Sequence, residues 1–294
     1  MVSPFKHNKL VLRLTPIQDS DIIKVTKEVK SMVIDHESLI GTFEQQKKLV
    51  SQFNLMDDDF FSVVMTNKEA CQFVIRTLTG IEDLTVIDVK TQYSIRNLGG
   101  HSVILDCYAE DSNHKIHNIE IQVKNNDNQP KRVRYYRTAI DFSIMEKGCS
   151  YEELPDVYMI FISAFDMFGL GRNHYEGEKR LKNSDYIIDD GVHELYFNTA
   201  VDDGTPLSEL LQYFKKSDPN NNNFGALSEA VRYQKETAEG VGHMCQAVER
   251  YGDEREKQGV VEVAKSLLKD GMTPEKVAQI TKLALEEVEK LIKD

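Results

Sequence analysis

The side chains best suited to catalysis or metal binding lie in the segment 102–124. A predicted β-hairpin brings Asp106, Glu120 and Gln122 together there. The polar stretch EDSNHK predicts the turn, and a hairpin symmetric about Asn113 sets Asp106 directly opposite Glu120. Directly paired side chains have Cβ atoms roughly 4.5–5.5 Å apart, so two carboxylates there repel each other unless a cation lies between them. Hard divalent cations such as Mg²⁺ favour carboxylate oxygens. The spacing therefore predicts a metal site and hydrolytic chemistry.

Both arms of the hairpin alternate between apolar and other residues, as the period of two along a strand requires. In the first arm Asp106 shares a face with Ile104 and Tyr108, and the reverse face carries Val103, Leu105 and Cys107. In the second arm Glu120 and Gln122 share a face with Asn118, opposite Ile119, Ile121 and Val123. This alternation predicts a strict division of each strand into two faces.

The spacing alone also fits a purely structural interpretation. Asp and Glu are common on the solvated face of an antiparallel sheet, and a short motif has a real rate of chance matches. Spacing by itself leaves both interpretations open.

An Asp on one strand followed by Glu-x-Gln on the next resembles the core of the PD-(D/E)XK nucleases. Gln122 stands where that superfamily usually has Lys, and one branch shares this departure: the PD-(D/E)XK nuclease family transposases, or recombination-promoting nucleases of the Rpn type. Further segments resemble this branch in the same order over residues 50–250: FNLMDDDFF (53–61), RNLGGHSVILDCYAED (96–111), PKRVRYYRTAID (130–141), LPDVYMIFISAFDMFG (154–169) and RYQKETAEGVGHMC (232–245).

The resemblance implies roles for individual residues. Asp106 and Glu120, with the carbonyl of Ile121, are expected to hold Mg²⁺, for which Mn²⁺ could substitute. Gln122 takes the place of the residue that positions the attacking water. The first core helix of these nucleases supplies another acidic residue, and the alignment favours Asp59, although Asp57 and Asp58 adjoin it. Acidic residues at a helix start are also ordinary N-caps.

A basic segment, KRVRYYR at residues 131–137, follows the motif hairpin directly. Asn128 and Pro130 predict the start of a helix that runs to about Lys147, with Gly148 as its stop. The helical spacing predicts a buried stripe made of Val133, Tyr136, Ile140 and Ile144. We expect the basic residues of this helix to bind double-stranded DNA; they are Lys131, Arg132, Arg134 and Arg137. The alternative is that they form an ordinary solvated basic face. Arg132 and Arg134 are expected to point away from the buried stripe.

The order of the remaining elements predicts an α/β fold. A broken helical pattern covers residues 58–80, strands are expected at 84–95, 157–165 and 193–199, and the hairpin and basic helix lie between them. Helix, three strands, helix and strand is the α-β-β-β-α-β order of a PD-(D/E)XK, restriction-endonuclease-like core. We expect this core over residues 49–216, after an N-terminal extension of residues 1–48 in which no motif is found.

A helical tail is expected after the core. Residues 217–254 are expected to form a linker and a helix, and residues 255–294 a tail similar to a helix-turn-helix; within this region, helices are expected at 226–250 and 256–269. The last helix carries several Glu, which disfavours phosphate contact. Self-association through these helices, giving a homo-oligomer, is therefore preferred over DNA binding by the tail.

Composition narrows the class of protein. Four cysteines are scattered through the 294 residues without Cys-x-x-Cys spacing, and we expect buried thiols rather than disulfides or zinc ligands. The longest apolar run is far shorter than the ~20 residues of a membrane helix, so we expect a cytoplasmic protein without membrane contact. A net charge of −12 is unusual for a DNA-binding protein, because phosphate contacts come mainly from Lys and Arg.

Two functions of different classes follow from these observations. The first is a Mg²⁺-dependent DNA endonuclease that hydrolyses phosphodiester bonds and acts in recombination or transposition. The second is a catalytically inactive descendant that binds DNA or a protein; the acidic charge and Gln122 motivate it. A toxin or phage-defence nuclease would share the chemistry of the first and differ only in its target.

Overall fold

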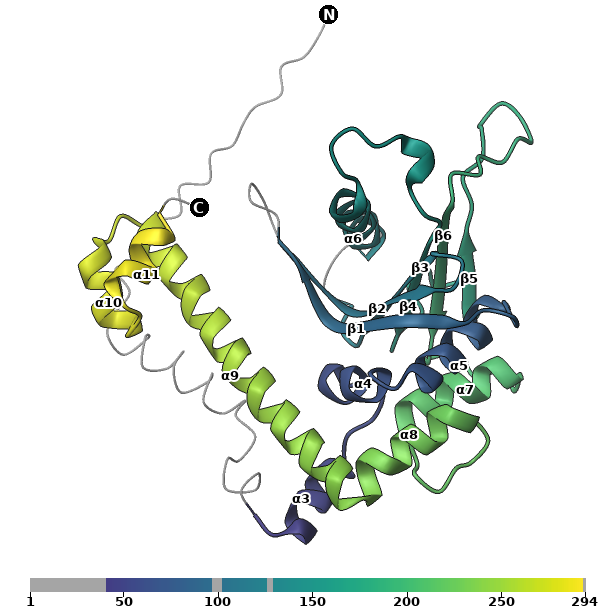
Figure 1. Ribbon diagram of the computed structural model, residues 1–294, viewed down its shortest axis with the longest axis horizontal. Coiled ribbons are helices and arrows are strands. Elements are labelled where there is room, and N and C mark those ends of the chain that lie inside the picture. Colours follow the sequence, from purple (N-terminus) through teal and green to yellow (C-terminus); the bar gives the residue numbers. More distant parts are fainter. Residues whose placement is uncertain (1–40, 97–101, 126–128, 293–294) are drawn as a thin grey trace, which may run out of the picture.

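A six-stranded mixed sheet forms the centre of the protein (Figure 1). The computed structural model describes residues 41–96, 102–125 and 129–292. The strands lie in the order β1-β2-β3-β4-β6-β5, with β3, β4 and β6 parallel and the other neighbours antiparallel. Their bounds are β1 Val86–Ile95, β2 Val103–Asp111, β3 Ile116–Gln122, β4 Val157–Ser163, β5 His174–Gly177 and β6 Val192–Asn198.

Helices cover the sheet on both faces, and each face has its own hydrophobic core (Figure 1). One face packs under α6, Gln129–Ile144. The larger core lies on the other face, under α3 Phe43–Val50, α4 Asp58–Met65, α5 Lys68–Thr79, α7 Pro206–Lys216, α8 Gly225–Glu236 and the start of α9. The order α4 and α5, three strands, α6 and β4 is the predicted α/β order, so the predicted fold is confirmed.

The broken helical pattern of residues 58–80 resolves into α4 and α5. Asn67 begins the second helix, because its side chain accepts a hydrogen bond from the Ala70 backbone N–H at 2.8 Å. Gly80 ends it with a left-handed backbone, φ 71°. The strands expected near residues 84–95, 157–165 and 193–199 are confirmed as β1, β4 and β6, whereas β5 was not predicted.

The predicted thiol burial is confirmed at three of four cysteines. Cys71, Cys107 and Cys245 are buried, and the sulfur atoms of Cys71 and Cys107 lie 3.8 Å apart. Cys149 is exposed, so the expectation was wrong there. It lies between the end of α6 and the short 3-10 helix Tyr151–Glu153, outside both cores.

The C-terminal helices differ from those predicted. The chain breaks at Thr237, and α9 then runs without interruption over Ala238–Lys269, so the expected break near residues 250–256 was wrong. Thr237 is extended, and its hydroxyl caps α9 by accepting from the Gly240 N–H at 3.0 Å. α8 and the first turns of α9 bury Leu227, Val231, Val241 and Met244 in the larger core.

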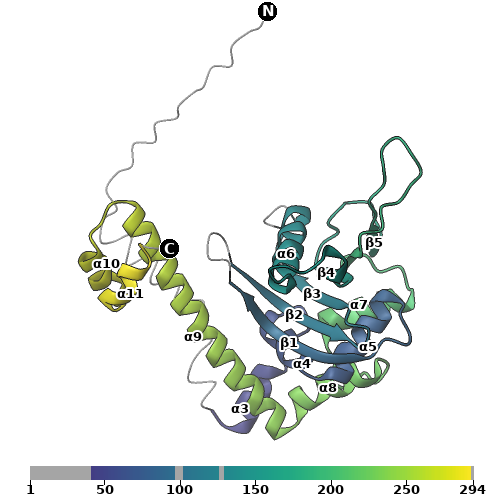
Figure 2. The ribbon, with the colours of Figure 1, turned by 45° about the horizontal axis from the view of Figure 1, so that its top comes forward.

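The far end of α9 leads away from the sheet and carries two short helices (Figure 2). They are α10 Pro274–Thr281 and α11 Leu285–Lys290, and Lys282 separates them with a left-handed backbone, φ 61°. Ala264, Val277 and Val288 form a small third core among these three helices. In the described part of the chain, no helix has both the length and the apolar character needed to cross a membrane.

Candidate active site

The motif hairpin has the register predicted from the sequence. Cys107 pairs with Ile119, and Tyr108 pairs with Asn118, so the hairpin is symmetric about Asn113. Asp111 shapes the turn, because its carboxylate accepts backbone hydrogen bonds from Asn113 and Lys115 at 2.8 and 3.0 Å. The next pair in this register would be Asp106 and Glu120, and there side-chain contacts replace the regular pairing.

The strict alternation predicted for β2 was wrong at Asp106. Val103 and Leu105 belong to the core under α6, whereas Cys107 and Ala109 belong to the core on the opposite face. The change of face coincides with two local features. Gln92 lies on β1 between the residues paired with Leu105 and Cys107, and its backbone is left-handed at φ 50°. The Asp106 carboxylate also accepts a hydrogen bond from the Ile121 backbone N–H at 2.9 Å.

Glu120 lies against Asp106 inside the sheet. Its carboxylate oxygen Oε1 accepts from the Asn118 side-chain amide at 2.9 Å and from the Asp106 backbone N–H at 3.3 Å. Only 1% of Glu120 is exposed, and its second oxygen, Oε2, is buried without a hydrogen-bond partner. A buried carboxylate oxygen without a partner is costly, because it has lost water and gained nothing.

The electrostatics of the pair favour a bound cation. Burial, followed by the negative charge of Asp106, raises the pKa of Glu120 well above its ordinary value. A divalent cation would reverse both effects by neutralising the two carboxylates. Among the described residues, no three His, Cys, Asp or Glu side chains cluster closely enough to hold a metal. Two carboxylates nevertheless suit Mg²⁺, which keeps several waters and binds through one or two carboxylates plus substrate phosphate.

Gln122 ends β3 on the same face as Glu120 and contacts the basic helix. Its amide oxygen accepts from Nη1 of Arg132 at 2.5 Å, and its amide nitrogen donates to the Lys124 carbonyl at 2.7 Å. The Arg132 guanidinium lies over the ring of Tyr136, 5.0 Å from its centroid. Arg132 therefore belongs to the carboxylate site as well as to the basic segment.

The basic helix α6 has the buried stripe predicted for it. Val133 and Ile140 are buried, with Tyr136 and Ile144 packed against the same core. The helix ends at Ile144 rather than at Lys147, so the expected length was wrong, although Gly148 does have a left-handed backbone at φ 99°. The predicted cap, Asn128, lies outside the described residues.

The other basic residues of this helix have different environments. Lys131 and Arg134 are exposed. Arg137 is half-buried, and its charge acts on Asp141 and Asp190. The predicted DNA-binding residues therefore divide into two whose side chains are exposed, Lys131 and Arg134, and two that are partly buried, Arg132 and Arg137.

Asp59 lies in the first turn of α4 and is buried. No cluster of three potential metal ligands exists among the described residues, so the structure does not group Asp59 with Asp106 and Glu120. Of the two alternatives, Asp58 begins α4, and Asp57 occupies its N-cap position and accepts from the Asn54 backbone N–H at 2.8 Å.

Two further polar residues of this region were not predicted. Asn118 is fully buried, donates to Glu120, and its own amide oxygen has no partner. Gln129, in the first turn of α6, is 2% exposed, and both ends of its amide lack partners. The alternation of the second arm places Asn118 on the face of Glu120 and could have indicated it. Nothing in the sequence distinguishes Gln129 from a surface glutamine.

A second polar pair lies nearer the hairpin turn. His117 is fully buried on β3, and its Nε2 lies 2.9 Å from the Asp111 carboxylate. Burial lowers the pKa of His117, and the hydrogen bond with Asp111 offsets this only in part. Burial alone would raise the pKa of Asp111, but hydrogen bonds from His117, Lys115 and Asn113 outweigh it and lower that pKa.

This pair predicts a loss of stability in weak acid. As the pH falls from about 7.5 to about 5, the unfolded chain takes up a proton at residue 117 that the folded chain resists, so the free energy of unfolding decreases. His117→Gln removes the titrating group, and urea denaturation at both pH values should show a smaller loss than in the wild type. Equal losses would contradict the prediction.

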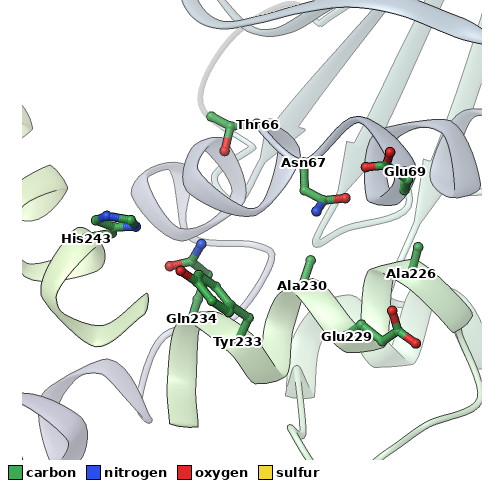
Figure 3. A pocket seen from close by; sticks show the side chains of 9 residues that line it. All are labelled: Thr66, Asn67, Glu69, Ala226, Glu229, Ala230, Tyr233, Gln234 and His243. Atoms are coloured by element: carbon green, nitrogen blue, oxygen red, sulfur yellow. The ribbon is translucent and has the colours of Figure 1, made fainter. Parts of the chain in front are cut away.

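A separate cavity of about 600 Å³ lies on the helical side of the protein (Figure 3). The α4–α5 connection, α8 and α9 contribute its lining, which is Thr66, Asn67, Glu69, Ala226, Glu229, Ala230, Tyr233, Gln234 and His243. None of the motif residues lines it. The carboxylate site is therefore distinct from this cavity.

Comparison with known protein families gives a match over part of the chain. Residues 59–189 match the family model described as PD-(D/E)XK nuclease family transposase, and this segment runs from Asp59 past the hairpin, α6 and β4. The comparisons with curated proteins and with solved structures give no match. The matched segment contains Asp106, Glu120 and Gln122 in their predicted order. Over residues 59–189 the chain is therefore similar to the PD-(D/E)XK nuclease family transposases.

Proposed function

We propose that this chain is a Mg²⁺-dependent DNA endonuclease that hydrolyses phosphodiester bonds in transposition or recombination. The observation that carries the proposal is the pair Asp106 and Glu120, with the Glu120 oxygen Oε2 buried and unpartnered. Asp106, Glu120 and the Ile121 carbonyl would hold Mg²⁺, or Mn²⁺ in its place. Asp59 remains a proposed further acidic residue of the site.

The side chains at the site define what each residue contributes. A divalent cation held here would supply a water of lowered pKa and would stabilise negative charge on the phosphate. Gln122 has neither a basic group nor a charge, so it could hold a water by hydrogen bonding but could not take its proton. That proton would have to pass to solvent or to a second water. Cleavage is expected to leave a 5′-phosphate.

The basic face of α6 is the proposed contact for double-stranded DNA. Four cations come from one helix, and two of them, Lys131 and Arg134, are exposed on its surface; the full set is Lys131, Arg132, Arg134 and Arg137. This local positive charge offsets the overall −12 where the substrate would lie. We further propose that the protein acts in the cytoplasm and forms a homo-oligomer through α10 and α11. Leu285, the first residue of α11, and Ile292, just after its end, are exposed apolar residues.

Plasmid nicking tests the proposed function. Wild-type protein should convert supercoiled plasmid to the open circle with Mg²⁺ and not with EDTA, and Asp106→Asn should not do so. If DNA ligase seals the nicked plasmid directly, the cleaved strand carries the expected 5′-phosphate. Equal nicking by wild type and Asp106→Asn, or none by either, would overturn the proposal.

The second candidate is a non-catalytic module that binds DNA. Gln122 favours it, because its amide is held by Arg132 and the Lys124 carbonyl and supplies no charge of its own. DNA binding that is indifferent to Mg²⁺ and to Glu120→Ala, in a protein that nicks no plasmid, would support this candidate.

A further inference from the structure

A positively charged side chain, Arg132 of α6, lies beside the carboxylate site but does not belong to the motif strands. Phosphodiester hydrolysis places extra negative charge on the phosphate, and fixed positive groups aimed at that charge lower the barrier. Gln122 is neutral, but the Arg132 guanidinium lies 2.5 Å from its amide oxygen. An arginine stays charged at all accessible pH values, so this charge is permanent.

The position of Arg132 is fixed from two sides. Gln122 accepts one guanidinium N–H, and the guanidinium lies 5.0 Å from the centroid of the Tyr136 ring. Gln122 lies at the end of the buried strand β3, and Tyr136 packs against the core under α6. These two contacts hold the guanidinium in one orientation before any substrate binds.

Arg132 faces the carboxylates and still has an unused donor. Its charge acts on the buried Glu120 and on the half-buried Asp106. Its Nε is buried and lacks a hydrogen-bond partner. The Nε of Arg137 is also buried without a partner, but the charge of Arg137 acts on Asp141 and Asp190 rather than on the carboxylate pair. Lys131 and Arg134, the neighbours of Arg132 on the helix, are exposed instead. Arg132 is therefore the cation of α6 that is built into the site.

We propose that Arg132 is a catalytic residue that donates to the scissile phosphate, and that Gln122 is a positioning residue that holds its guanidinium. This inference rests on the proposed nuclease function and assigns the missing positive charge of that site. The amide of Gln122 is bonded at both ends, to Arg132 and to the Lys124 carbonyl. Orienting Arg132 is thus a second role of Gln122, whose amide oxygen keeps another lone pair for the water.

Single-turnover cleavage at saturating DNA and Mg²⁺ tests the assignment. Arg132→Met should slow the cleavage step by about 100-fold, as for loss of one preorganised donor in other enzymes. Arg132→Lys should recover little of this, because an ammonium lacks the planar fork. Gln122→Leu should slow the step less, and combining it with Arg132→Met should add almost nothing, because both remove one interaction.

Moving the positive charge from residue 132 to residue 122 distinguishes a catalytic role of Arg132 from a role in packing. The double variant Gln122→Lys with Arg132→Met puts a cation back into the site from β3 and should recover at least part of the lost rate. Arg250→Met is the matched control, because Arg250 also lies over a tyrosine ring, 4.7 Å from the Tyr251 centroid, but on α9. It should cleave like the wild type.

A second readout does not depend on cleavage. In the metal-free protein, the side-chain ¹H–¹⁵N signals of Arg132 should show slowed rotation of the guanidinium, and Gln122→Leu should abolish the slowing. Adding duplex DNA should shift the Arg132 Nε signal.

The outcomes distinguish the inference from the proposed function. A wild type that cleaves no duplex overturns the proposed function and the inference with it. Wild-type rates in Arg132→Met overturn the inference alone. A slow Arg132→Met that melts much earlier than wild type, and that Gln122→Lys does not rescue, assigns Arg132 to packing and also overturns it.

Discussion

Glu120→Gln is expected to lower Mg²⁺-dependent cleavage by about 1,000-fold or more while making the metal-free protein more stable. Even groups one step away from a metal contribute about 10–100-fold to activity, and Glu120 is proposed as a direct ligand. The amide has the same shape as the carboxylate, and its oxygen can keep both hydrogen bonds, from Asn118 and from the Asp106 backbone. What the substitution removes is a buried negative charge beside Asp106.

The gain in stability follows from the cost of that charge. The Glu120 oxygen Oε2 is buried without a partner, and the charge of Asp106 repels it. Leaving a buried charged group uncompensated costs about 1–3 kcal/mol or more. In EDTA, urea denaturation should therefore give a higher free energy of unfolding for Glu120→Gln than for the wild type.

Magnesium should reverse the order of the two proteins. A ligand that binds only the folded state, at about 100 times its dissociation constant, stabilises by about 2.7 kcal/mol. The wild type should gain this amount and Glu120→Gln should gain little. Glu110→Gln is the matched control, since Glu110 lies on β2 and contacts His114 rather than Asp106. Equal stabilisation of Glu120→Gln and wild type by Mg²⁺ would exclude Glu120 as a ligand.

The register of the motif hairpin could be predicted because its determinants are local. The turn residues and the alternation of the two arms are contiguous in sequence, and together they set Asp106 and Glu120 on neighbouring strands. The same holds for the buried stripe of α6 and for the Gly80 stop of α5, each of which depends on neighbours within a few residues.

The departures from prediction depend on contacts between distant segments. β2 changes face at Asp106 where Gln92 of β1 has a left-handed backbone and the Ile121 N–H of β3 offers a hydrogen bond. A period-two pattern read along one strand contains neither partner. Arg132 likewise looked like one of four exposed cations, because its partner Gln122 lies ten residues away on another element.

The burial of the hairpin histidine, His117, also depends on a distant segment that the local sequence does not reveal. His117 stands next to the polar turn residues of the hairpin, where the sequence does not show that its side chain is buried. It is a buried strand residue, because Asp111 supplies a partner and Tyr158 of β4 stacks on its ring with centroids 4.8 Å apart. Sequence spacing shows that Asp111 and His117 flank one turn, but not that both are covered.

The break between α8 and α9 leads to the second large effect, which is on stability alone. Gly240→Ala should lower the free energy of unfolding by about 3 kcal/mol, at the upper end of the usual cost of overpacking. A Cβ at Gly240 would lie 2.1 Å from the Tyr233 carbonyl oxygen and 2.7 Å from the Gln234 Cα. Both obstacles are backbone atoms, so no side chain can rotate away to make room.

The backbone at this junction cannot yield cheaply either. The Tyr233 carbonyl ends α8 by accepting from the Thr237 backbone N–H at 3.2 Å and from its hydroxyl at 2.7 Å. Moving that carbonyl would break the cap that turns the chain from α8 into α9. Val231 and Val241, one on each side of the junction, are fully buried in the larger core, so a shift would also open that core.

Gly242→Ala is the matched control, because it lies in the same helix with no atom within 4 Å of the added Cβ. Alanine is favoured over glycine inside a helix by about 1 kcal/mol, so Gly242→Ala should be neutral or stabilising in urea denaturation. Equal destabilisation by the two variants would show that helix flexibility, not the close approach of α8, explains the glycines. If Gly240→Ala lowers the free energy of unfolding and Gly242→Ala does not, the close approach of α8 explains Gly240. The two substitutions add the same methyl group and differ only in what that group contacts.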